Sequence, residues 1–480
     1  MKRIGVLVVA YNAASTLAAV LDRIPRDFVD RIDRVLVHDD YSQDATYLVG
    51  LGYQQTTPEL PLEVIRHPRN LGYGGNQKAS YAWAMEHGLD IVVLLHGDGQ
   101  YAPELLPEMV APLERDEADA VFGSRMMEAG AARRGGMPMY KYVGNKILTG
   151  IENAAAGMDL SEWHSGYRAY SVEALRELPL EITSDGFDFD TQIILQLHEA
   201  GKRIVEIPIP TYYGGEICHV NGLKYAADVT HAALRYRAHK MGLGTGETAF
   251  ATEHYEMKDS AATSHGRLLE ILTRLPPSRI LDLGCDDGSM GERLRLAGHE
   301  VTGVDLHKLE GVGDRLDRFV EFDLEFGVPP EVGGDYDVVL AADVLEHVRR
   351  PDLLLADIRS RLTPTGKVVT SVPNMGHWYP RVRVAAGRFD YDRRGILDSG
   401  HLRFFTRQSF ERLVRAGGFE IRHRDAVGVP FEVSKRGVAA PAPASGLRRT
   451  VEAVESVAVG TWPTLFGYQL VYVLAPAAER

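Results

Sequence analysis

Two polar side chains follow an apolar run in the segment IVVLLHGDGQYAPE, residues 91–104. The apolar stretch Ile91–Leu95 predicts a buried strand, and Asp98 and Gln100 lie in the loop at its carboxyl end. Open α/β sheets place ligands at that end of their strands. Carboxylate and amide oxygens suit a hard divalent cation such as Mg²⁺ or Mn²⁺, whereas an ordinary polar turn has the same composition. The loop alone therefore leaves a cation site and a plain turn open.

Two further segments of the first half carry residues that suit a nucleotide. Asp39 and Asp40 follow the apolar run 34–38, and their carboxylates can accept hydrogen bonds from a nucleobase or a ribose. The glycine-rich loop 70–76 enters an expected helix that carries Lys78. Flexible glycines at a helix N-terminus suit a phosphate, to which Lys78 would add a positive charge.

Three acids lie close together in the segment SDGFDFDTQ. If an acceptor hydroxyl reacts at this site, it needs a carboxylate as general base. Asp188 and Asp190 alternate with phenylalanines, which places both acids on one face if the segment is extended. Asp185 is a third candidate. Capping of the following helix is the alternative explanation for these acids.

A second group of residues that could bind a ligand begins with the segment RILDLGCDDG, residues 279–288. A strand that opens through glycines into a helix allows close approach of a ligand, and Asp305 ends the next strand, where an acid can accept from a ribose. Asp323 could frame an adenine edge. NAD and S-adenosylmethionine both fit this outline, but Asp286 and Asp287 would repel a pyrophosphate and suit a sulfonium or amino group. The methyl donor is therefore favoured.

Two histidines are candidate bases for the second half. A hydroxyl nucleophile needs a base within hydrogen-bond reach, and His347 and His401 both lie in polar loops. Packing of these loops is the alternative for both residues.

The elements that must position these residues follow one pattern twice. Apolar runs alternate with helical patterns from Ile4 onward and again from Leu268 onward, which predicts two mostly parallel sheets with helices on both faces. The Gly/Thr-rich and charged stretch 241–260 interrupts the pattern. We therefore expect a first domain at 1–240, a linker at 241–260 and a second domain at 261–480, both α/β and doubly wound.

Composition excludes some partners. The net charge of −13 over 480 residues argues against nucleic acid, and only Cys218 and Cys285 are available for thiol chemistry, which fits a reducing cytoplasm. No apolar stretch reaches the length of a transmembrane span. The basic and apolar stretch 133–150 suits either peripheral contact with the inner face of a membrane or ordinary packing.

The first half resembles family 2 glycosyltransferases of the GT-A type. The motifs VVAYN, HDDYSQDAT, RNLGYGGNQKA, LLHGDGQYAPE, FGSR and HSGYRAYS are most similar to the polyprenyl-phosphate mannosyl- and glucosyltransferase branch. The resemblance covers about residues 1–235. It implies a nucleotide-sugar donor, a glycan or polyprenyl-phosphate-like acceptor, and a metal-dependent transfer that usually inverts the sugar.

The same resemblance implies roles for individual residues. Asp39 contacts the nucleoside, Asp98 and Gln100 hold the cation and the diphosphate, and Arg125 and Arg168 face phosphate groups. One departure concerns the metal loop. His96 stands where the family usually has its first aspartate, and its imidazole is a softer ligand that suits Mn²⁺.

The second half resembles class I S-adenosylmethionine-dependent methyltransferases. The motifs LDLGCDDG, VTGVD, FDLE, VLAADVLEHV, LTPTGKVVTSVPN and GHLRFFT occur in the family's order over about residues 255–475. The resemblance implies that Asp282, Gly284 and Gly288 line the methionine end, that Asp305 holds the ribose and that Asp323 lies near the adenine. Asp286 departs from the usual middle glycine, but aspartate tolerates the left-handed backbone that such a turn needs.

Together these features predict a bifunctional enzyme that transfers a sugar and a methyl group, with one glycan or glycolipid as a shared substrate. Two alternatives stay open. Either one domain is active while the other binds substrate or acts as a scaffold, or the chain is a binding module of a glycan-synthesis complex.

Overall fold

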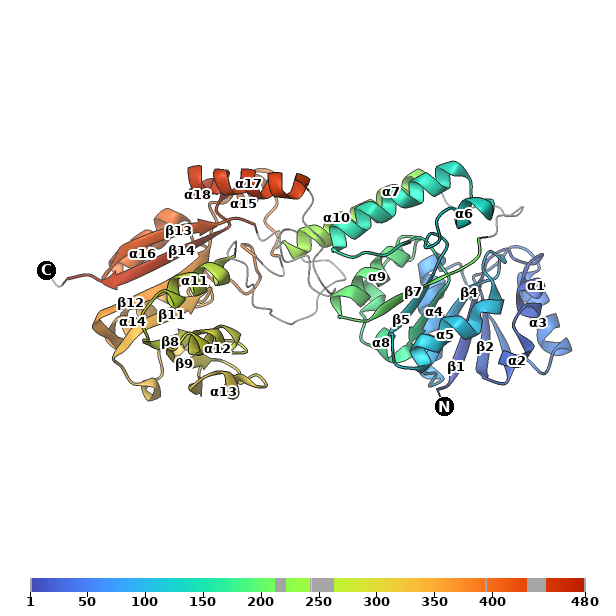
Figure 1. The fold of residues 1–480 in the computed structure, drawn as a ribbon, viewed down its shortest axis with the longest axis horizontal. Helices are drawn as coiled ribbons and strands as arrows, with labels where there is room; N and C mark the ends of the chain where they lie inside the picture. Colours follow the sequence, from blue (N-terminus) through green and yellow to red (C-terminus); the bar gives the residue numbers. More distant parts are fainter. Residues whose placement is uncertain are drawn as a thin grey trace. The chain divides into compact units, whose positions relative to one another are not determined.

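The computed structural model describes residues 2–211, 222–241, 243, 263–392, 395–429 and 446–478. These residues form two compact units, one from the chain up to Arg237 and one from the chain beyond it (Figure 1). Of the expected linker 241–260, residues 241 and 243 are described and the rest lies outside the described residues.

The first unit is built on a seven-stranded sheet with the order β3-β2-β1-β4-β6-β5-β7. Strand β6 is antiparallel to both of its neighbours, and the other paired strands are parallel. The strands are β1 (Ile4–Ala10), β2 (Ile32–Asp39), β3 (Leu62–Arg66), β4 (Ile91–His96), β5 (Ala120–Ser124), β6 (Arg168–Ser171) and β7 (Ile204–Pro208). The helices are α1 (Leu17–Asp22), α2 (Arg26–Val29), α3 (Thr46–Thr56), α4 (Tyr73–Glu86), α5 (Leu106–Glu114), α6 (Ala131–Arg134), α7 (Met139–Ala156), α8 (Val172–Arg176), α9 (Phe189–Glu199) and α10 (Gly222–Lys240).

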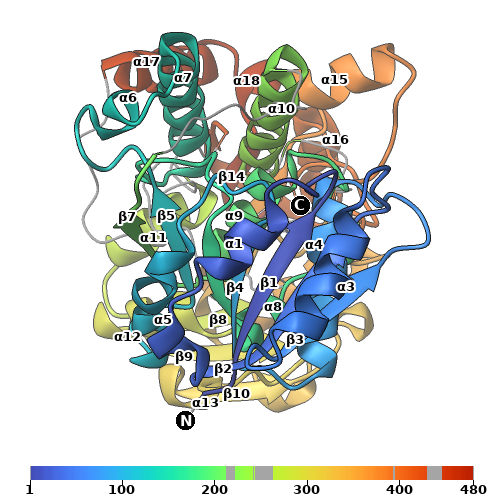
Figure 2. The ribbon, with the colours of Figure 1, turned by 90° about the vertical axis from the view of Figure 1, so that its right-hand side faces the viewer.

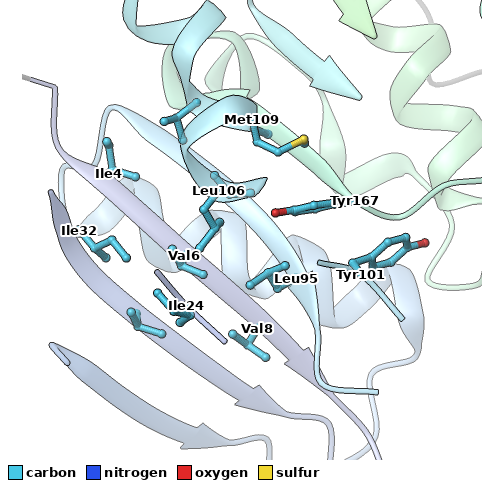
Figure 3. Packing of buried hydrophobic residues seen from close by; sticks show 14 of the residues in the cluster. Ile4, Val6, Val8, Ile24, Ile32, Leu95, Tyr101, Leu106, Met109 and Tyr167 are labelled. Carbon is cyan, nitrogen blue, oxygen red and sulfur yellow. The ribbon is translucent and has the colours of Figure 1, made fainter. Parts of the chain in front are cut away.

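Helices cover both faces of this sheet because its central strands are apolar on both sides. Val6 and Val8 of β1 pack into a core beneath α1, α3 and α5, whereas Leu7 and Val9 pack into a second core beneath α4, α8 and α9. Figure 2 shows α1, α3 and α5 lying across one face of the sheet. Figure 3 shows the first core, in which Leu95 of β4 lies beside the side chains of β1.

The second unit has its own seven-stranded sheet, with the order β10-β9-β8-β11-β12-β14-β13. Strand β14 is antiparallel to both of its neighbours, β12 and the edge strand β13, and the other paired strands are parallel. The strands are β8 (Arg279–Leu283), β9 (Glu300–Asp305), β10 (Arg318–Glu321), β11 (Tyr336–Ala342), β12 (Leu362–Pro373), β13 (Phe419–Val427) and β14 (Gln469–Pro476). The helices are α11 (Ser264–Thr273), α12 (Ser289–Leu296), α13 (Val312–Arg315), α14 (Pro351–Arg361), α15 (Trp378–Ala385), α16 (Arg407–Ala416), α17 (Gly446–Thr461) and α18 (Pro463–Phe466).

This second sheet also separates two cores. Leu281 and Val339 face α14 and α16, whereas Ile280 and Val338 face α11 and α12. The expected pair of doubly wound α/β domains is therefore confirmed.

The register of the strands brings the candidate residues to one edge of each sheet. Val9 of β1 pairs with His38 on one side and with His96 on the other, so Asp39 and the HGDGQ loop flank the end of β1. In the second unit Leu283 pairs with Val304, so the glycine turn after β8 and Asp305 at the end of β9 are neighbours.

Candidate functional site

A buried carboxylate that can accept a further hydrogen bond lies at the end of β2. Asp39 is fully buried, and its Oδ1 accepts a hydrogen bond from the Ser42 backbone N–H at 3.3 Å. Nε of Arg66 lies 3.3 Å from Oδ2, yet no group among the described residues donates a hydrogen bond to that oxygen. Asp39 is therefore charge-compensated and still able to accept a hydrogen bond from a ligand.

The neighbouring acid, Asp40, is already engaged. Its two carboxylate oxygens accept from the backbone N–H groups of Leu71 at 2.6 Å and Gly72 at 3.1 Å. Asp40 thereby fixes the glycine-rich loop that leads into α4. The predicted contact of Asp40 with a nucleoside stays a prediction.

The start of α4 differs from the expectation of a phosphate site. The N–H of Gly74 donates to the backbone carbonyl of Asp185 at 2.8 Å, and a Cβ on Gly74 would lie 2.5 Å from the carbonyl of Ser184. Lys78 contacts the same segment, with its Nζ 2.6 Å from the Asp185 carboxylate and 2.9 Å from the Thr183 carbonyl. The glycines therefore allow close packing of the chain on itself, and a phosphate role for Lys78 stays a prediction.

The three predicted metal ligands share the turn after β4. Asp98 and Gln100 are half-buried, and the Gln100 N–H donates to Oδ1 of Asp98 at 3.0 Å. His96 lies at the base of this turn, edge-on to the ring of Tyr101 at 5.0 Å. Burial lowers the pKa of His96, against the opposing effect of Asp98. A neutral imidazole beside a carboxylate is a chemically suitable donor set for a divalent cation.

Arg125 forms an ion pair that sequence reasoning missed. Its Nε donates to Glu162 at 3.0 Å and its backbone N–H donates to the same carboxylate at 2.7 Å. Burial acts to raise the pKa of Glu162, but the Arg125 charge and hydrogen bonds lower it overall. The signal in the sequence was an acid two residues before the HSGYR motif.

Asp188 and Asp190 do not share a face, so that expectation is wrong. The segment is the start of helix α9, in which residues two apart point in different directions. The half-buried Asp188 accepts from Ser184 at 2.6 Å and from Gln192 at 2.7 Å. Asp190 is buried instead.

Asp190 belongs to a buried network. Its carboxylate accepts from the Tyr73 hydroxyl at 2.9 Å and lies 3.6 Å from Nη1 of Arg168. The Tyr73 hydroxyl is also 3.5 Å from Nε2 of His96, which connects the network to the metal loop. Arg168 is almost fully buried and donates to the carbonyls of residues 163, 165 and 190. To bind a phosphate, Arg168 would have to exchange these hydrogen bonds for bonds to the ligand. A phosphate role for Arg168 therefore stays a prediction.

The glycine turn of the second unit adopts the conformation that its sequence needs. Gly284, Asp286 and Gly288 all have positive φ, at 71°, 50° and 80°. The expected left-handed backbone at Asp286 is therefore confirmed. The Asp286 N–H donates to Oδ2 of Asp305 at 2.8 Å, which joins the turn to the predicted ribose acceptor.

Asp282 is a second buried acid with an unsatisfied oxygen. No group of the described residues donates to its Oδ2, and burial together with the charge of Asp305 raises the pKa of Asp282 to about 7. Asp323, by contrast, is half-buried and accepts from the Glu325 N–H at 2.9 Å. The group of acids gives this edge a negative potential that suits a cationic ligand.

The structure brings the two candidate bases together. The rings of His347 and His401 lie 4.8 Å apart, with His347 exposed and His401 buried. Glu346, which sequence reasoning missed, is buried beside them. Its signal was an acid next to a histidine after a strand.

Comparisons with known proteins agree with this division. Residues 5–178 match the family model "Glycosyl transferase family 2", and residues 255–424 match "Methyltransferase domain". An undecaprenyl-phosphate mannosyltransferase of Micrococcus luteus is 32% identical over 209 residues, which are 43% of this chain and 82% of that protein. A ubiquinone biosynthesis O-methyltransferase of Marinobacter nauticus is 36% identical over 110 residues, 21% of this chain and 46% of that protein.

A solved structure, glucosyl-3-phosphoglycerate synthase from Mycobacterium tuberculosis with uridine diphosphate, is similar with a TM-score of 0.38 and 20% identity. The similarity covers 51% of this chain and 81% of that one. Among the described helices of the present chain, none combines the length and the apolar character that crossing a membrane requires.

Proposed function

The chain belongs to glycosyl transferase family 2 through its first unit and carries a methyltransferase domain in its second, and on this premise we propose that it is a bifunctional enzyme. The first unit transfers a sugar from a nucleotide sugar, and the second transfers a methyl group from S-adenosylmethionine. One observation supports both halves: a buried acid at the carboxyl edge of each sheet, Asp39 and Asp282, has an oxygen to which no described group donates.

The proposed donor site of the first unit uses residues at the ends of β2, β4 and β5. Asp39 accepts from the nucleoside, and Asp98 with Gln100 and His96 would hold Mg²⁺ or Mn²⁺. A bound cation, together with the Arg125 guanidinium, would stabilise the charge that develops on the leaving diphosphate. Transfer then proceeds by in-line attack of the acceptor on the sugar.

A polyprenyl phosphate is the acceptor that we favour. Asp188 and Asp190 each accept hydrogen bonds from neighbouring side chains, and Asp190 also faces Arg168. These contacts occupy the carboxylate oxygens that a hydroxyl acceptor would have to reach. A phosphate acceptor is already anionic and needs no base, and the Micrococcus relative is named for such an acceptor.

The proposed cofactor of the second unit is S-adenosylmethionine, which supplies an electrophilic methyl group on a positively charged sulfur. Asp282, with the turn at Gly284 and Gly288, would hold the methionine end, Asp305 the ribose, and Asp323 the adenine. The negative potential of these acids favours a cationic ligand over the pyrophosphate of NAD. If the methyl acceptor is a hydroxyl, His347 is the exposed one of the two candidate bases that could take its proton.

A thermal-shift screen tests both halves in one protein. We expect a nucleoside diphosphate with Mn²⁺ to stabilise the chain, and S-adenosylhomocysteine to stabilise it separately. Asp98→Ala should abolish only the first shift and Asp305→Ala only the second, while the exposed control Glu59→Gln should keep both.

The same screen separates the alternatives. If only one of the two ligands shifts the melting temperature of the wild-type chain, the result would favour a chain with one active domain. The absence of both shifts would contradict the enzymatic proposal and favour a binding or scaffolding module. Radiolabel transfer to polyprenyl phosphate, followed by methylation of that product, would test whether the two units share a substrate.

A further inference from the structure

Three side chains with metal-ligating atoms converge after the carboxyl end of β11. Glu346, His347 and His401 each offer one ligand atom that lies within 4.8 Å of the other two. Two backbone hydrogen bonds fix this arrangement, because the N–H groups of Leu402 and Arg403 donate to the Glu346 carbonyl at 2.8 and 2.9 Å. The loop that carries His401 is thereby held against the turn that carries Glu346 and His347.

The Glu346 carboxylate is not satisfied by the protein. Its side chain is buried, with 1% relative exposure, and neither oxygen has a hydrogen-bond partner among the described residues. Buried charged groups are normally paired or coordinate metals, because an unpaired buried charge is costly. A cation beside Glu346 would supply the missing partner.

Both imidazoles are oriented for coordination. Nδ1 of His347 lies 3.1 Å from the Gly400 carbonyl, and Nδ1 of His401 lies 3.1 Å from the Ile396 carbonyl. A carbonyl oxygen can only accept, so Nδ1 carries the proton and Nε2 carries the lone pair in each neutral ring. Metal-ligating histidines usually donate their second N–H to such a group, which fixes the tautomer and the ring.

We propose that Glu346, His347 and His401 bind a divalent transition-metal ion through one carboxylate oxygen and two Nε2 atoms. Two imidazoles and one carboxylate suit Mn²⁺, Fe²⁺, Co²⁺ or Zn²⁺ better than Mg²⁺ or Ca²⁺, which prefer oxygen ligands throughout. The site is distinct from the cation site proposed at Asp98, because the two groups of ligands belong to different units.

The exposure of His347 leaves the solvent side of this ion accessible. A substrate hydroxyl bound there would release its proton to solvent more easily, since a divalent cation lowers the pKa of a coordinated oxygen. Its oxygen would then bond to the methyl carbon while the carbon–sulfur bond of S-adenosylmethionine breaks, with the electron pair left on sulfur. This role rests on the proposed methyl transfer and replaces His347 as a general base.

The site is tested by measuring the binding of Mn²⁺ to the full chain with electron paramagnetic resonance and calorimetry. Asp98→Ala is used as the starting chain so that the other proposed cation site is removed. We expect it to bind one ion, and a further Glu346→Gln or His401→Ala to weaken binding by about tenfold or more. The matched control is His423→Ala, which removes an exposed histidine of β13 and should leave binding unchanged.

Two results would overturn the site: no ion bound by the starting chain, or an affinity in the Glu346→Gln and His401→Ala variants that equals that of the starting chain. A shift by S-adenosylhomocysteine in every variant shows that the fold is intact. Ion binding without any such shift would support the site and count against the proposed methyl donor.

Discussion

Unsatisfied buried acids are the residues that indicate ligands most directly in this protein. Asp39, Asp282 and Glu346 are all buried, and each has at least one oxygen without a hydrogen-bond donor among the described residues. Other acids of the same segments, such as Asp40 and Asp188, are satisfied by the protein itself. Residue type and spacing could not separate these two groups, because the difference lies in which backbone N–H and side-chain donors surround each carboxylate.

Asp282→Asn should change the pH dependence of stability of the second unit. The pKa of Asp282 is raised to about 7 by burial and by Asp305. The stability that this group contributes is fully present below its unfolded pKa and is lost as pH rises through 7. We therefore expect the asparagine variant to gain stability relative to wild type as pH rises from about 4 to about 7, by on the order of a few kcal/mol. Chemical denaturation without cofactor measures the difference.

Asp323→Asn is the control, since that acid is half-buried and accepts a backbone hydrogen bond. A stability difference for Asp282→Asn that stays constant with pH would contradict the prediction.

At the scale of elements, close packing decides what the glycine-rich loop does. The sequence places glycines before a helix and suggests a phosphate site, but helix α4 begins at Tyr73 and packs onto the start of α9. Glycine is needed at position 74 because atoms of Ser184 and Phe189 occupy the space where a Cβ atom would lie. The segment that fills this space lies more than a hundred residues further along the chain, so local sequence patterns could not predict the contact.

Helix α7 exposes apolar side chains that the expected peripheral membrane contact would bury. Val143 and Ile147 lie one turn apart and are both exposed, as are Met139 and Tyr140 at the start of the helix. The double variant Val143→Asp/Ile147→Asp should reduce binding to anionic phospholipid vesicles by about tenfold, because two apolar side chains leave the interface. Co-sedimentation measures the loss.

Leu48→Asp provides the comparison, since Leu48 is an exposed apolar residue on α3 of the same unit. Equal vesicle binding by both variants, or no binding by the wild-type chain, would reject a membrane role for α7.

At the scale of the whole molecule, each sheet has its own pair of cores. Among the described residues, each of these four core clusters draws on the strands of one sheet. We therefore expect calorimetry to resolve ligand effects by unit, with S-adenosylhomocysteine stabilising only the transition that is lowered by Leu340→Ala. At a concentration one hundred times its dissociation constant, the stabilisation should be about 2.7 kcal/mol.

A nucleoside diphosphate with Mn²⁺ should stabilise the transition that Val93→Ala lowers, since Val93 belongs to the first core. If either ligand shifted both transitions equally, the two units would have to fold as one cooperative body, and this prediction would fail.

The sequence by itself determined the fold class, the two families and the strand ends at which we propose that ligands bind. Apolar periodicity and short motifs are local properties, so the runs that became β1, β4, β8 and β9 could be placed without a structure. The short strand β6 was not expected, because its pairing partners β4 and β5 lie far away in the chain. The position of the loop HGDGQ after β4 follows from the sequence. The contacts among Tyr73, Asp190 and Arg168 do not, because these residues lie far apart in the chain.

Only the tertiary structure decided which polar side chains are satisfied within the protein and which remain available to a ligand. Lys78 meets Asp185, Arg125 meets Glu162, and His401 meets Glu346 and His347 through long-range packing. Hydrogen bonds and burial depend on neighbours in space, and no pattern along the chain encodes them locally.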